Sequence, residues 1–100
     1  MTNETKRKLA AKFPSLIKYS SSLNEHLGNG FSWYDTNQSM AEREWEWVVT
    51  KIVNGLAEDN SLKGRVAYRN VLLRICGSFH AMLFATTEQK VQALLEIGVI

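Results

Sequence analysis

The chain has one cysteine and one proline in 100 residues, and it has no long run of apolar residues. Because Cys76 has no second cysteine to pair with, the fold cannot depend on internal disulfides, which suits a reducing compartment. The basic start of the chain is not followed by an apolar stretch of signal-peptide length, and no segment approaches the length that crosses a bilayer. We therefore expect a cytoplasmic protein that does not contact membranes.

Bulk composition is typical of a globular domain. Apolar residues make up 45% of the chain, charged residues make up 22%, and the net charge is +2. A chain of this size can bury one core without cross-links, but it has little room for a deep substrate cleft. We find no repeat or linker, so residues 1–100 are expected to form a single domain.

Apolar residues recur at helical spacing along most of the chain, which predicts an all-α fold, a compact bundle of four to five helices. Thr2 or Asn3 is a suitable N-cap for the first helix, and Pro14 interrupts that helix and opens a second one. Ser39 and Glu42 have the spacing of a capping box. The expected helices cover residues 3–13, 14–27, 40–56, 62–85 and 86–97.

The apolar stripes of these helices predict the core. In residues 40–56 the stripe consists of Trp45, Val48, Val49, Ile52, Val53 and Leu56. In residues 62–85 it consists of Tyr68, Leu72, Ile75, Cys76, Phe79, Met82 and Leu83. The pair Gly77-Ser78 is a weak point in the second stripe, and residues 78–85 form a strand in the alternative interpretation.

The residue types needed for catalysis are sparse. Cys76 and His80 are four residues apart, but an apolar helix offers them neither an oxyanion hole nor room for a substrate. One cysteine and two distant histidines do not match the spacing of a zinc site. We therefore predict a protein that is not an enzyme and that needs neither a metal nor another cofactor.

Trp47 is the sharpest candidate for a binding residue. It lies opposite the apolar stripe of its helix, among polar neighbours that include Arg43 and Glu44. Tryptophan is enriched at interface hot spots, so this face is expected to contact a partner. In the alternative interpretation Trp47 is covered by other parts of the chain. The loop residues Trp33, Tyr34 and Asp35 complete the predicted contact set.

Charge alternates along the chain: residues 1–18 are basic, residues 35–59 are acidic, and residues 60–76 are basic again. This pattern favours internal salt bridges or a contact surface of both signs. As an alternative function, the basic helices bind nucleic acid directly. The residues expected to do so are Lys8, Lys12, Arg65 and Arg69.

Two short segments are similar to a pattern in small phage-encoded proteins. The first is Lys12-Phe13-Pro14-Ser15-Leu16-Ile17, and the second is Gly28-Asn29-Gly30-Phe31-Ser32-Trp33. Those proteins carry a lysine-aromatic-proline start and a glycine-acid-glycine-tryptophan turn, followed by a helix; here Asn29 replaces the acid. The resemblance implies an origin in a phage or mobile element, where proteins of this size often block a host protein, as anti-CRISPR inhibitors do.

The sequence thus predicts a binding protein that docks on a larger host protein or nucleoprotein complex. The resemblance further implies that this protein inhibits a host nucleic-acid-handling complex. Direct nucleic-acid binding is the second hypothesis, and a self-associating structural protein is the third.

Overall fold

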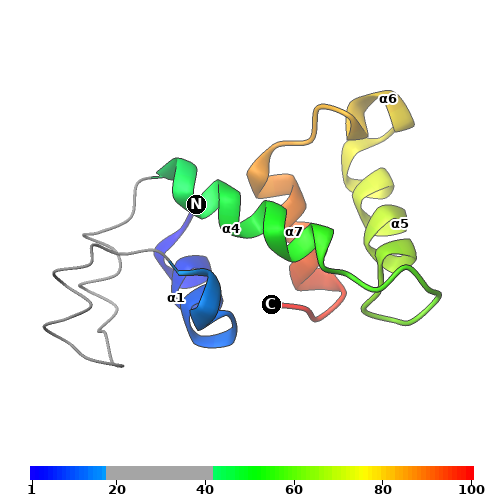
Figure 1. The fold of residues 1–100 in the computed structure, drawn as a ribbon. Coiled ribbons are helices and arrows are strands. Elements are labelled where there is room, and N and C mark those ends of the chain that lie inside the picture. Colours follow the sequence, from blue (N-terminus) through cyan, green and yellow to red (C-terminus); the bar gives the residue numbers. More distant parts are fainter. Residues whose placement is uncertain (18–41) are drawn as a thin grey trace, which may run out of the picture. The chain divides into compact units, whose positions relative to one another are not determined.

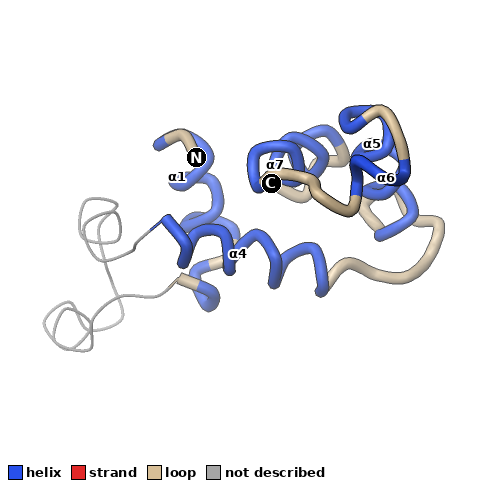
Figure 2. The backbone as a smooth tube through the Cα atoms, turned by 90° about the horizontal axis from the view of Figure 1, so that it is seen from above, coloured by secondary structure: helices blue, strands red, loops and turns tan. Residues whose placement is uncertain are grey.

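The computed structural model describes residues 1–17 and 42–100. All regular elements in these residues are helical, five α-helices and one turn of 3-10 helix, and they include no strand (Figure 2). The predicted all-α class is confirmed. The chain divides into two compact units, Met1–Val48 and Val49–Ile100 (Figure 1 shows the elements of both).

The first unit begins with helix α1, Asn3–Lys12. The Thr2 side chain caps it, because its hydroxyl accepts a hydrogen bond from the Thr5 backbone N–H at 3.2 Å. Pro14 has no N–H to continue the helix, and a 3-10 turn, η1, covers Pro14–Leu16. The predicted start of the first helix and its interruption at Pro14 are both confirmed. The helix expected over residues 14–27 is wrong in its described part, because the 3-10 turn ends at Leu16 and the backbone of Ile17 is extended. Residues 18–27 lie outside the described residues.

Helix α4, Glu42–Asn54, is the strongly amphipathic helix that the sequence predicts. Trp45, Val48 and Val49 are fully buried, and Ile52 is 5% exposed, so the predicted stripe is a core stripe. Val53 is half-buried. Ser39, the first member of the expected capping box, lies outside the described residues.

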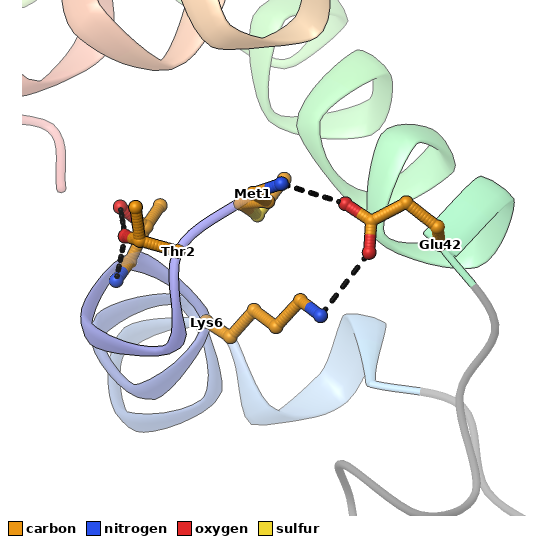
Figure 3. A network of polar contacts seen from close by, with 5 residues as sticks. Met1, Thr2, Lys6 and Glu42 are labelled. Carbon is orange, nitrogen blue, oxygen red and sulfur yellow. Dashed lines mark hydrogen bonds and ion pairs between the residues drawn. The ribbon is translucent and has the colours of Figure 1, made fainter.

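A small polar network joins α1 to the start of α4 within the first unit (Figure 3). Glu42 Oε1 accepts a hydrogen bond from the amine of Met1 at 2.9 Å, and Glu42 Oε2 lies 3.1 Å from Lys6 Nζ. The hydrogen bond from the amine, followed by the contacts with Lys6, lowers the pKa of Glu42. Lys6 Nζ also lies 5.8 Å from the ring centroid of the buried Trp45, within the range of a cation–π contact.

The second unit contains α5 (Arg65–Cys76), α6 (Phe79–Met82) and α7 (Thr87–Glu96). Helix α5 packs against α7 and against α6. A capping box starts α7: the Thr86 hydroxyl accepts from the Gln89 N–H at 3.2 Å, and Gln89 Oε1 accepts from the Thr86 N–H at 2.9 Å. The buried residues of α5 and α7 are Tyr68, Leu72, Val91, Ala93 and Leu94.

Candidate functional site

The helix expected over residues 62–85 is wrong, because the chain breaks it at Gly77. The candidate site lies at this break. Gly77 has φ = 91°, a left-handed conformation that ends α5, and its N–H donates to the Leu73 carbonyl at 2.8 Å. Ser78 then caps α6, because its hydroxyl accepts from the Ala81 N–H at 3.1 Å. As a result α6 lies at the C-terminal end of α5 as a separate short helix (Figure 1).

The break removes two residues of the predicted stripe, Phe79 and Leu83, from the core. Tyr68 and Leu72 are buried as expected, but Phe79 is 75% exposed and Leu83 is 79% exposed. A glycine in the left-handed region resets the direction of the chain, so helical spacing counted through Gly77 no longer describes one face. The predicted core role of Phe79 and Leu83 is therefore wrong. Residues 79–82 are helical rather than part of a strand.

A groove with a volume of about 600 Å³ lies between α5 and α6. Its lining is mainly apolar, and most of the apolar side chains come from the segment after Gly77. The apolar lining residues are Val66, Leu73, Phe79, Met82 and Leu83. Phe84 follows directly and is 73% exposed. Exposed apolar side chains that gather in this way often mark a contact site.

Arg69 is the only charged residue that lines the groove. The polar lining residues are Arg69, Asn70 and His80, with no carboxylate among them. The His80 ring meets the Phe84 ring edge-on, with 5.4 Å between ring centroids and an interplanar angle of 62°. This contact places the imidazole within the apolar surface.

The arginines of α5 differ in their partners. Arg65 Nη1 lies 2.6 Å from Glu58 Oε1, and Arg74 forms an ion pair with Glu96. Arg69 is exposed, and within residues 1–17 and 42–100 it forms no ion pair. The one groove-lining arginine is therefore available for an external carboxylate as far as the described chain is concerned.

Arg65, predicted as a nucleic-acid contact, has an internal role. Besides the bond from Nη1 to Glu58, Arg65 Nη2 donates to the Asn54 carbonyl at 2.9 Å. The Arg65 backbone N–H donates to the Ala57 carbonyl at 2.8 Å. Together these bonds join the end of α4 to the start of α5. Its side chain is only 22% exposed. Arg65 thus holds the loop between the two helices.

The other basic candidates lie on α1 in the first unit. Lys8 Nζ is 3.8 Å from Glu4 Oε1, an i,i+4 pair on the helix surface. Lys12 is exposed in the last turn, where a positive charge suits the helix dipole. Both positions are ordinary for surface lysines, and their contact with nucleic acid stays a prediction.

Trp47 and its neighbours lie in the first half of α4. The Trp47 side chain is half-buried, Arg43 is exposed and Glu44 is half-buried. Trp47 is thus neither sealed in the core nor open to solvent in the manner of Phe79. Its role as a contact residue stays a prediction. The loop residues Trp33, Tyr34 and Asp35 lie outside the described residues.

Comparisons with protein-family models, with curated proteins and with solved structures found no significant match. Separately, no helix in residues 1–17 and 42–100 has both the length and the apolar character needed to cross a bilayer.

Sequence reasoning missed the α5–α6 groove, although a signal was present. Gly77-Ser78 has the order of a helix end followed by a new N-cap. Assigning Ser78 as a cap would have started a new helix there and placed Phe79, Leu83 and Phe84 on a short element. A short element cannot bury large side chains on several sides.

Proposed function

We propose that this chain is a non-enzymatic binding protein that docks on a larger protein assembly through the α5–α6 groove. The observation that carries the proposal is the exposure of Phe79, Leu83 and Phe84 beside an apolar groove. Burying such a side chain contributes about 2 kcal/mol, so three of them supply a substantial driving force for association. Large apolar residues clustered at one place are characteristic of contact surfaces.

The shape of the groove favours a macromolecule over a small ligand. Small-molecule sites usually enclose most of the ligand surface within a concave pocket. Here two lining residues, Phe79 and Leu83, are about three-quarters exposed, so the groove is open to solvent on its α6 side. A protein segment laid along α5 and α6 would cover both side chains at once.

Charge favours a different protein over a second copy of this chain. If two copies met groove to groove, each would bring the positive charge of Arg69 into the contact and neither would bring a lining carboxylate. Like charges placed together in an interface are unfavourable. We therefore assign the groove to a partner of different sequence.

The biological setting that we propose is inhibition by occlusion: the chain covers a surface of a host nucleic-acid-handling complex. This part of the proposal is supported by the sequence resemblance to small phage-encoded proteins and by the size of the chain. Trp47, Arg43 and Glu44 remain proposed as a further contact set on α4. The alternative function, direct nucleic-acid binding, has less support at Arg65, because its side chain already binds Glu58 and the Asn54 carbonyl.

Site-specific photo-crosslinking in cells that express the chain tests the docking proposal. A photoreactive residue replaces Leu83 in the groove, and a matched control replaces Gln92, an exposed residue of α7. We expect a protein captured from position 83 and not from position 92. The purified partner should then bind the wild-type chain and lose at least tenfold in affinity for Leu83→Ser. Equal capture from both positions, or unchanged affinity of Leu83→Ser, would contradict the proposal.

A further inference from the structure

We propose that the segment bound by the α5–α6 groove is an amphipathic helix whose apolar face carries a carboxylate at its edge, paired with Arg69. This inference rests on the proposed docking function and adds the chemistry of the partner. It is argued from two observations: only two of the three α5 arginines have a carboxylate partner in the described residues, and the groove is lined by two helices.

Two faces of α5 differ in what they contact. Tyr68 and Leu72 are four residues apart and are buried toward the core. The groove face consists of Val66, Arg69, Asn70 and Leu73, which follow the i, i+3, i+4, i+7 spacing of a single helix face. A helix with a second ordered face, partly apolar and not used in the core, is arranged to meet another element.

The carboxylate on the partner is inferred from the ion pairs that the arginines of α5 form. Arg65 is matched by Glu58 and Arg74 is matched by Glu96, whereas Arg69 has no carboxylate partner in the described part of the chain. A neutral apolar partner would cover Arg69 and remove part of its hydration without replacing it. A carboxylate on the partner supplies the two acceptor oxygens that a guanidinium binds in parallel. Charge complementarity thus selects an acidic partner.

The helical form of the partner follows from the walls of the groove. Both walls are helices, and the described residues provide no strand edge to which an extended peptide would add. A helix laid in such a groove inserts side chains at i, i+3, i+4 and i+7. Met82, a half-buried residue of the lining, has a flexible side chain that can adjust to these side chains.

A displayed library of amphipathic helices tests the inference. The peptides are about 16 residues long with a fixed leucine face, and the positions at the edge of that face are randomised. Selection uses the full wild-type chain, with counter-selection against Leu83→Ser to remove binders that do not use the groove. Circular dichroism checks that each variant is folded.

We expect the selected peptides to be enriched in Asp and Glu at one edge position. Their affinity should fall about tenfold or more for Arg69→Gln and stay within about twofold for the matched control Arg74→Gln, and the difference should shrink with added salt. Groove-dependent binders without acid enrichment, bound equally by Arg69→Gln, would overturn the carboxylate while leaving the docking function intact. The absence of any groove-dependent binder would overturn both. A wild-type dimer that Leu83→Ser abolishes would assign the groove to a second copy.

Discussion

Glu42 at the start of α4 holds the ammonium group of Lys6 on α1, with 3.1 Å between Oε2 and Nζ, while its other oxygen holds the amine of Met1. The same Lys6 lies over the ring of the buried Trp45. One carboxylate therefore keeps a cation in place above the largest side chain of the first unit's core.

Replacing Glu42 with Gln should reduce the free energy of unfolding by roughly 1 kcal/mol or less, because the carboxylate is half exposed and water screens it. The effect should depend on pH. The folded chain holds Glu42 at a lowered pKa, so its contribution is complete above the ordinary glutamate pKa of about 4.3 and is lost as pH falls through the folded value. Denaturant unfolding of both proteins from neutral to acidic pH measures this. A difference that stays constant down to strongly acidic pH would contradict it.

Arg65 and Arg69 are four residues apart on α5 and form a matched pair for a second prediction. Arg65→Ala removes the bonds to Glu58 and the Asn54 carbonyl and should cost about 1 to 3 kcal/mol. Arg69→Ala should change stability by less than about 0.5 kcal/mol, since its side chain is exposed and forms no hydrogen bond or ion pair within the described chain. Equal losses in urea unfolding would show that Arg69 also has a structural role.

The third prediction concerns the break between α5 and α6. Gly77→Ala should destabilise the chain by roughly 1 kcal/mol, because φ = 91° strains any residue with a Cβ, even though no atom lies within 4 Å of that Cβ. Gly77→Asn is the control: asparagine tolerates this conformation better, so it should lose less. Thermal unfolding compares the three proteins. If alanine and asparagine behaved alike, strain at Gly77 would not determine the loss.

The parts of the fold that the sequence predicts correctly are local or periodic. The burial of Trp45, Val48 and Val49 follows from spacing within one uninterrupted helix. The starts of α1 and α7 follow from Thr2 and Thr86, whose hydroxyls can satisfy backbone N–H groups near them in sequence. Such features need no knowledge of distant contacts.

The candidate site is less predictable because it depends on a break and on distant partners. Periodicity treats Leu72 and Leu83 as members of one stripe, and only the conformation of Gly77 separates them. Likewise, sequence alone does not distinguish Arg65 from Arg69. Their roles differ because the chain brings Glu58 and Asn54 to one of them, which is a tertiary effect.

Tyr68 provides the last prediction, at alkaline pH. Its side chain is 4% exposed, and burial, with a smaller contribution from Cys76, raises the pKa of its phenol to about 12. In the unfolded chain the phenol loses its proton near pH 10, so above that pH the folded state binds more protons than the unfolded state. Stability is therefore complete below about pH 10 and should fall by about 3 kcal/mol as pH rises toward 12.

Ultraviolet absorbance of tyrosinate follows this titration directly. The chain has three tyrosines, and we expect a late step in the native protein that disappears in Tyr68→Phe. The same variant should flatten the loss of unfolding free energy above pH 10, because phenylalanine fills the buried site with no proton to release. If the late step remained in Tyr68→Phe, another tyrosine would be the source. If all phenols of the wild type titrated together near pH 10, Tyr68 would be in contact with water, and the core side of α5 would be less closely packed than its burial indicates.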